Sequence, residues 1–277
     1  MELYIEKAVS KSLRPIMSHF SHRKKISQDF FAHFCYRVRQ NKDFQSALIY
    51  VKSDLLSSFL LEKPIGDPVK VVVAGGSDYD VSIREYQLMR DFRGTVFYVQ
   101  NLNFPESENI RLLPIGIEDL SWARNGMFWN FSPSMARREK QRQLLVGPFG
   151  LTHPDRRQLT TELSHSQGVK IVEQRMSSWR YSRLASRYQF VACPRGNGLD
   201  THRFWETLYR GSIPVVLDSY WARTLKSYGL PLVVVSTWSD LDYLDNWDES
   251  EIEIGAHMLL NTLWWEEKLI SELASTI

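Results

Sequence analysis

The chain has 277 residues, 43% of them hydrophobic, which is enough for the cores of two modest domains. Its 34 basic and 32 acidic residues nearly balance, so the composition excludes a disordered polyelectrolyte and shows no overall charge signature of nucleic-acid binding. Two cysteines are too few for a disulfide framework, and no apolar run reaches the length of about 18 residues that a membrane span needs. The N-terminus also lacks the apolar stretch of a signal peptide, so we expect a cytoplasmic protein with no membrane span.

The first half of the chain predicts helices and then a strand–helix–strand pattern. Residues 1–62 carry apolar side chains at mixed three- and four-residue spacing, which favours mostly helices. The continuous, β-branched run Val69–Gly76 predicts a buried parallel strand. A helix is predicted next at Val81–Phe92, and further strands at Thr95–Gln100 and Ile110–Ile115.

After residue 136 the alternation of strands and helices starts again. Strands are predicted at Leu144–Gly147, Val169–Gln174, Gln189–Cys193, Ile213–Leu217 and Leu232–Val235. The helices between them are predicted at Pro154–His165, Ser178–Arg187, Thr201–Arg210 and Tyr220–Ser227. We therefore expect two domains, residues 1–136 and 137–250, and a C-terminal helix in 251–277 that packs back across both.

This alternation predicts an α/β protein with two Rossmann-like domains, each a doubly wound parallel sheet, facing a central cleft. In such sheets ligands bind where strand ends and helix N-termini converge. Candidate functional residues should therefore follow the strands directly. The fold class by itself does not separate an enzyme from a binding protein.

The most informative segment runs from Phe190 to Tyr220. The turn Gly196-Asn197-Gly198 follows a predicted strand, and its glycines let backbone N–H groups approach a ligand closely. Asp200 or Thr201 can cap the next helix. His202 is expected to point away from the helix face that carries the other polar groups. That face is formed by residues three or four apart, namely Asp200, Arg203, Glu206 and Arg210.

This set of residues suits a nucleoside diphosphate. Main-chain N–H groups and the helix dipole favour negative charge, and the guanidinium groups of Arg195 and Arg203 can bind phosphate oxygens bidentately. Glu206 would repel phosphate, but it can accept two hydrogen bonds from a ribose diol, as the acidic residue of dinucleotide sites does. The plain alternative is that Arg203 and Glu206 form an ion pair on a solvated helix face.

Three motifs in this segment resemble the donor-binding signature of the exostosin-like glycosyltransferases. That signature has a C-P-R-G segment, an R-x-x-E helix and a G-x-I-P-V-V strand in this order. Here the matching residues are Cys193–Gly196, Arg203–Glu206 and Gly211–Val216. The ribitol xylosyltransferase branch is similar in the same segment, whereas the N-terminal half of the chain agrees with the family only in layout.

The resemblance implies a GT-B fold, in which residues 137–250 would hold the donor nucleotide and residues 1–136 mainly the acceptor. It also implies a UDP-sugar donor, inversion at the anomeric centre and no metal requirement, so we expect no cofactor. The chain lacks the membrane anchor of the animal Golgi members and is short. We therefore expect a soluble bacterial or viral version, acting in a bacterial cell or a virus-infected host cell.

Further donor-site candidates follow the first strand of the second half. Thr152 could cap the helix after the turn Gly147–Pro154, and Arg156 in its first turn would face the diphosphate across the cleft. The alternative is a capped helix with exposed arginines. The predicted donor-binding residues are therefore Thr152, Arg156, Arg195, Gly196, Gly198, Asp200, Arg203 and Glu206.

An inverting transferase needs a group that deprotonates the acceptor hydroxyl. We predict Asp78 for this role because it follows the first strand of its half, although it could also cap the next helix. An Asp-x-Asp string such as Asp78–Asp80 can hold a metal, but the donor site is expected in the other domain, so we predict no metal site. Gln100 and Asn101 are expected to bind acceptor hydroxyls. The alternate bases are Asp80, Glu118 and His153.

The resemblance, taken with these residues, implies an inverting, metal-independent glycosyltransferase that moves a sugar from a UDP-sugar to a hydroxyl of a glycan. Xylose is the sugar suggested by the similar xylosyltransferase branch. The alternative is a non-catalytic nucleotide- or glycan-binding protein of the same fold. A nicotinamide-dependent oxidoreductase is disfavoured because no third glycine follows Gly196-Asn197-Gly198 in the expected place. We expect no nucleic-acid partner.

Overall fold

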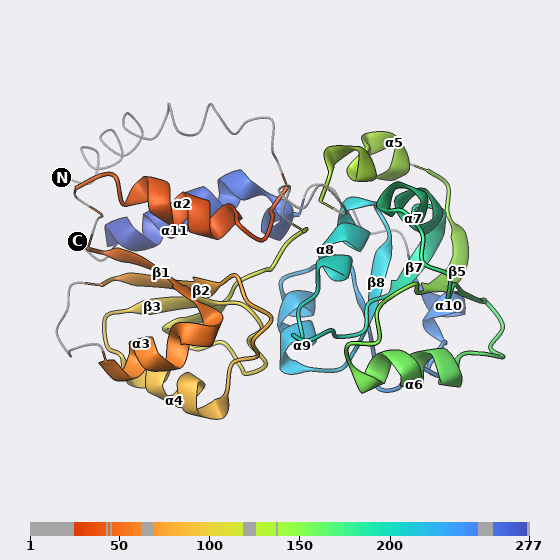
Figure 1. Cartoon of the computed structure of the whole chain (residues 1–277), viewed down its shortest axis with the longest axis horizontal. Helices are drawn as coiled ribbons and strands as arrows, with labels where there is room; N and C mark the ends of the chain where they lie inside the picture. Colours follow the sequence, from red (N-terminus) through yellow and green to blue (C-terminus); the bar gives the residue numbers. More distant parts are fainter. Residues whose placement is uncertain are drawn as a thin grey trace.

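The computed structural model describes residues 25–42, 44, 46–62, 69–118, 126–136, 138–248 and 257–275. It contains two parallel β-sheets, each with helices on both faces, and these form two lobes side by side (Figure 1). The predicted class of two α/β units with parallel sheets is confirmed. Helix predictions over residues 1–24 and 251–256 lie outside the described residues.

The first lobe is built on a sheet whose strands follow one another in chain order. Its parallel strands are β1 (Leu48–Lys52), β2 (Val71–Gly75), β3 (Val96–Val99) and β4 (Ile110–Leu112). β1 is a strand in residues 1–62, for which mostly helices were predicted and in which the other described elements are helical. A segment of five residues with mixed burial is too short for the spacing of its apolar side chains to distinguish a strand from a helix.

Helices cover both faces of this first sheet (Figure 1). One face carries α2 (Phe30–Val38) and the C-terminal α11 (Thr262–Ser275), and the other carries α3 (Leu56–Glu62), preceded by η1 (Ser53–Leu55), and α4 (Ile83–Asp91). The Trp265 ring of α11 lies 5.3 Å from Phe31 and 6.1 Å from Tyr98. The C-terminal helix therefore packs chiefly on the first lobe.

The second lobe has a sheet with the strand order β6-β5-β7-β8-β9. The strands are β5 (Gln141–Val146), β6 (Val169–Ile171), β7 (Tyr188–Ala192), β8 (Ile213–Leu217) and β9 (Val233–Val235). The chain first winds outward to β6 and then returns past β5 to β7, so this sheet is doubly wound. Among the described strands, the first sheet has no such reversal. The prediction of a doubly wound sheet therefore holds for the second lobe and not for the first.

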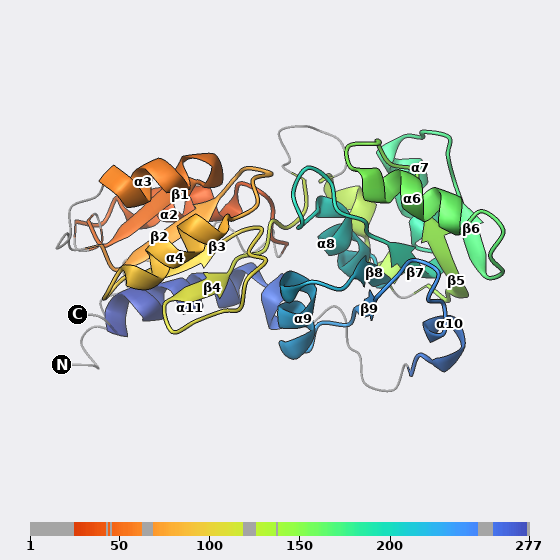
Figure 2. The same ribbon diagram turned by 90° about the horizontal axis from the view of Figure 1, so that it is seen from below.

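Two clusters of buried side chains place the helices of the second lobe on opposite faces of its sheet. One cluster includes residues of α6 and α10, and the other joins residues of α7, α8 and α9 to the core of the first lobe. Figure 2 shows α8 and α9 as the elements nearest the first lobe. The helical elements are η3 (Phe128–Phe131), α5 (Pro133–Ala136), α6 (Pro154–Glu162), α7 (Ser178–Ala185), α8 (His202–Tyr209), α9 (Tyr220–Ser227), α10 (Tyr243–Asn246) and η5 (Met258–Leu260).

The lobes are connected by hydrogen bonds as well as by the shared core. The Tyr209 hydroxyl of α8 lies 2.9 Å from the Ile26 N–H and 2.8 Å from the Leu260 carbonyl, with which it makes hydrogen bonds. Within the described ranges, no helix combines the length and the apolar character needed to cross a lipid bilayer.

Candidate functional site

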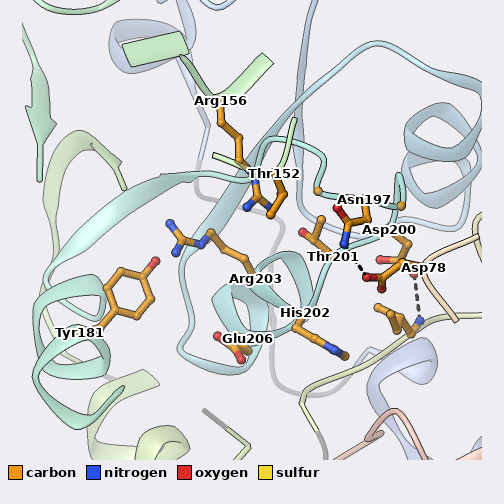
Figure 3. Close-up of a pocket in the computed structure, with 13 residues that line it drawn as sticks. Asp78, Thr152, Arg156, Tyr181, Asn197, Asp200, Thr201, His202, Arg203 and Glu206 are labelled. Carbon is orange, nitrogen blue, oxygen red and sulfur yellow. Dashed lines mark hydrogen bonds between the residues drawn. The ribbon is translucent and has the colours of Figure 1, made fainter. Parts of the chain in front are cut away.

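A pocket of about 290 Å³ lies where the strand order of the second sheet reverses (Figure 3). The helices after β5 and β7 leave the sheet on opposite faces, so the loops between them separate at the carboxyl ends of these strands. Thr152 and Arg156, which follow β5, line one side of the pocket. The opposite side is lined by the β7–α8 segment, which includes Gly196 and Arg203. This is the position at which doubly wound sheets bind ligands.

The glycines of the β7–α8 loop allow a close approach to neighbouring groups. A Cβ atom on Gly196 would lie 2.8 Å from Nη2 of Arg156. A Cβ atom on Gly198 would lie 2.8 Å from Oδ1 of Asn101 in the first lobe. The loop therefore needs these glycines both to admit the Arg156 guanidinium and to dock on the first lobe.

Arg203 lies in the first turn of α8, with its guanidinium group on the pocket wall. This group lies over the rings of Phe149 and Tyr181, at 5.1 Å and 4.8 Å from their centroids, and Nη2 donates to the Pro148 carbonyl. Nη1 is buried and has no hydrogen-bond partner among the described residues. Thr201, which caps α8, makes no side-chain cap bond. Donors on this wall are therefore left for a ligand.

Arg156 of α6 brings a second guanidinium group to the same wall. Its Nη1 donates to the Gly150 carbonyl at 2.8 Å and its Nε to the Arg195 carbonyl at 2.9 Å. Burial, and then the charge of Arg203, lower the pKa of Arg156 from its ordinary value. An arginine remains a cation near neutral pH even so, so the wall concentrates positive charge.

Glu206 and Arg210 form a buried ion pair one turn along α8. Nη2 of Arg210 donates to Oε2 of Glu206 at 3.2 Å, and Nε of Arg210 donates to the Ser182 hydroxyl at 3.1 Å. Glu206 also lines the pocket. Its partner is thus Arg210 within the core, which contradicts the alternative of an Arg203–Glu206 pair on a solvated helix face.

Asp78 lies at the pocket as predicted, in the loop after β2, and its Oδ2 accepts a hydrogen bond of 3.2 Å from the Asn197 amide. Asp80 instead binds the β7–α8 loop, pairing with Arg195 and accepting from the Leu199 N–H at 2.9 Å. A contact of Arg195 with the diphosphate stays a prediction, because Arg195 pairs with Asp80 and is not among the residues that line the pocket. The charge of Arg195 is neutralised by Asp80, and the pair holds the two lobes together.

Asp200 also has a structural position, because its side chain is only 2% exposed. Oδ2 accepts from the Ile115 N–H of the first lobe at 2.9 Å, and Oδ1 accepts from the Trp205 indole at 2.7 Å. Burial raises the pKa of Asp200 to about 7, although these hydrogen bonds act in the opposite direction. Asp200 borders the pocket, but both carboxylate oxygens are bonded within the protein, which corrects its predicted role as a donor ligand.

Gln100 and Asn101, the predicted acceptor-binding residues, are fully buried. Gln100 accepts from the Gly76 N–H and donates to the Pro114 carbonyl, at 2.8 and 3.1 Å. Asn101 accepts from the Asp200 N–H at 2.7 Å and donates to the Ser77 carbonyl at 3.3 Å. Both amides are thus committed to the loops of the protein, which corrects the prediction that they bind sugar hydroxyls.

His202 lines the pocket, and its ring points away from Arg203 and Glu206, the helix face from which it was predicted to diverge (Figure 3). Its Nδ1 lies 2.9 Å from the Gly116 carbonyl oxygen. A carbonyl oxygen only accepts hydrogen bonds, so Nδ1 carries the proton of the neutral ring and Nε2 keeps its lone pair. His202 is therefore a possible proton acceptor that the sequence analysis missed.

The other alternate bases lie elsewhere. His153, rather than Thr152, caps α6, and its Nδ1 accepts from the Asp155 N–H at 3.3 Å. It lines a groove on the outer side of α6. Glu118 is half-buried at the end of the described range 69–118, outside the set of residues that line the pocket.

Tyr181 of α7 is a pocket residue that the sequence did not single out. Its local sequence gives no sign of a binding role, because α7 follows a different strand from α6 and α8. Tyr181 is the α7 residue among those that line the pocket. In the described part of the chain, no cluster of three or more His, Cys, Asp or Glu side chains is arranged to hold a metal ion.

A scan against known protein families found no match, and a search of curated proteins found none. Among solved structures, the chain is similar to AviGT4, a glycosyltransferase involved in avilamycin A biosynthesis, with a TM-score of 0.42 and 12% sequence identity. The match covers 80% of this chain and 77% of that chain.

Proposed function

We propose that the protein is a glycosyltransferase that uses a nucleoside diphosphate sugar as donor and a glycan hydroxyl as acceptor. The observation that carries the proposal is the convergence of the Arg156 and Arg203 guanidinium groups beside the start of α8. Two cations and a helix N-terminus without a side-chain cap suit two adjacent phosphates. Glu206, one turn further along the helix, provides a carboxylate for the ribose diol.

In the proposed reaction, Asp78 takes the proton of the acceptor hydroxyl while its oxygen attacks the anomeric carbon of the donor. The new carbon–oxygen bond forms as the bond from the anomeric carbon to the diphosphate breaks. The diphosphate leaves with the bonding electron pair, and attack from the opposite face inverts the anomeric centre. Arg156 and Arg203 stabilise the negative charge that develops on the leaving group.

The proposal assigns the charge of the leaving group to guanidinium groups, so it requires no metal ion. The donor is a UDP-sugar in this proposal, and xylose is the sugar to test first, because the motifs at the end of β7, in α8 and in β8 resemble those of the xylosyltransferase branch. Asp78 is preferred as the base because its carboxylate lies on the first-lobe side of the pocket.

A ligand that binds only the folded state raises the unfolding midpoint, so thermal unfolding with UDP, GDP and CMP tests the donor site. We expect a rise with UDP that a chelator does not change, and release of UDP when a UDP-sugar and an acceptor glycan are supplied. Binding without release would support the non-catalytic alternative. A rise that appears only with Mn²⁺ would contradict metal independence.

A further inference from the structure

The hydroxyl group of Tyr181 is a buried polar group for which the described part of the protein supplies no partner. The side chain is 7% exposed, and its oxygen makes no hydrogen bond with any described residue. Buried hydroxyls in folded proteins are nearly always hydrogen bonded, because a buried hydroxyl without a partner loses its hydrogen bonds to water and gains none in exchange. Tyr181 lines the pocket, so a bound ligand is the natural source of the missing partner.

The surroundings of Tyr181 define what that partner must be. Its ring lies close to two guanidinium groups, with its centroid 4.8 Å from that of Arg203 and 5.4 Å from that of Arg210. Nη1 of Arg203 is a second buried donor without a described partner, and Figure 3 shows the Tyr181 hydroxyl directed toward the Arg203 guanidinium. A guanidinium group only donates, so a ligand atom shared by both side chains must be an acceptor.

Charge distinguishes between the possible acceptors. Burial raises the pKa of Tyr181, so its hydroxyl keeps its proton and can donate. The cation of Arg203 favours an anionic oxygen over the neutral oxygens of a ribose or a base, whereas the charge of Arg210 is balanced by Glu206. Within a nucleoside diphosphate, the anionic oxygens are those of the phosphates.

We propose that Tyr181 is a donor-substrate contact whose hydroxyl donates a hydrogen bond to the phosphate oxygen bound by Arg203. This inference rests on the proposed function and adds to it a residue from α7, on the side of the pocket away from the first lobe. It predicts that Tyr181 distinguishes phosphorylated from unphosphorylated nucleosides.

Tyr181→Phe tests this assignment, because it removes one oxygen and keeps the ring close to the two arginines. The affinities of the whole protein for UDP and for uridine are measured by calorimetry. We expect UDP to bind about tenfold more weakly or worse, as for the loss of a hydrogen bond to a charged group, and uridine to bind unchanged. The variant should be no less stable than wild type without ligand, because the hydroxyl has no described partner to lose.

Tyr243→Phe is the matched control. The Tyr243 hydroxyl is also buried without a described partner, but its ring packs on Phe190 at 5.0 Å, in the cluster on the other face of the sheet. This variant should bind both ligands like wild type.

Three outcomes would overturn the assignment, and they have different meanings. Unchanged UDP binding by Tyr181→Phe would show that the hydroxyl does not touch the ligand. An equal loss for UDP and uridine would place the contact on the nucleoside. Failure of the wild-type protein to bind either ligand would refute the proposed function itself, and this inference with it.

Discussion

The two sheets place similar loops at their carboxyl ends but use them differently. In the first lobe, Asp80 and Asn101 follow β2 and β3 and are bonded to the β7–α8 loop. In the second lobe, Arg156 and Arg203 follow β5 and β7 and line the pocket. The difference follows from strand order. The reversal between β5 and β7 separates two neighbouring loops and leaves space for a ligand, whereas the described strands of the first sheet have no such reversal.

The sharpest test of this difference compares two arginines of the β7–α8 segment. Arg203→Ala should lower kcat/KM for glycosyl transfer at least about a hundredfold, because it removes charge from the leaving group. Arg195→Ala should cost less than about tenfold, because it breaks a partly exposed ion pair with Asp80. Comparable losses in the two variants would contradict the separation of roles.

Asp78 and His202 reach the same pocket from different lobes, and paired variants decide which is the base. Asp78→Asn should lower kcat by about a hundredfold or more while leaving the KM for the donor nearly unchanged. His202→Gln should have a smaller effect on kcat. The reverse order would assign the proton transfer to the imidazole, whose orientation is fixed by the Gly116 carbonyl.

Two glycines test how closely the lobes are packed at the loop. Gly198→Ala should lower the free energy of unfolding by about 1–3 kcal/mol, because its Cβ would meet Asn101 at 2.8 Å and the Asp78 carbonyl at 2.9 Å. Gly150→Ala is the matched control, since its nearest neighbours lie at 3.7 and 3.8 Å. Urea unfolding measures both variants, and equal stability of Gly198→Ala and wild type would contradict the close docking.

The most gradual expected effect is a pH dependence of stability from Asp200. Burial raises its pKa from 3.8 to about 7, so the protonated group favours the folded state. The stabilisation from protonated Asp200 is complete at pH values below the pKa of this group in the unfolded chain. It is lost as the pH rises through the pKa of the group in the folded protein. Between about pH 4 and 7 the free energy of unfolding should fall by at most about 1.4 kcal/mol per pH unit from this group.

Asp200→Asn removes this titration and isolates the contribution. The free energies of unfolding of wild type and variant are measured in urea at about pH 4.5 and about pH 7. The stability of the wild type relative to the variant should be greater at the lower pH. A difference that does not change with pH would contradict the raised pKa.

The sequence predicted the second lobe well, because its long alternation of apolar strands and amphipathic helices has a clear period. It did not predict β1, whose five residues are too few to show a period. Strand order also stayed hidden, because periodicity reports which residues are buried and not which strands are neighbours. The two sheets therefore looked alike in sequence although only one has a reversal.

The candidate site was predicted in part, for a related reason. Arg203, Glu206 and Gly196 were found because they share one short segment with readable spacing. Arg195 looked equivalent to Arg203, since nothing nearby shows that Asp80, in the other lobe, pairs with it. Tyr181 was missed because its role depends on the packing of α7 beside α8, which brings together residues from separate segments.

The central claim is that the pocket at the strand reversal binds a nucleoside diphosphate through Arg156 and Arg203. A crystal structure of the protein with UDP tests it most directly. We expect both phosphates within hydrogen-bond distance of these two guanidinium groups and the ribose hydroxyls at Glu206. UDP bound elsewhere, such as in the groove outside α6, with Arg156 and Arg203 in contact only with protein, would contradict the claim.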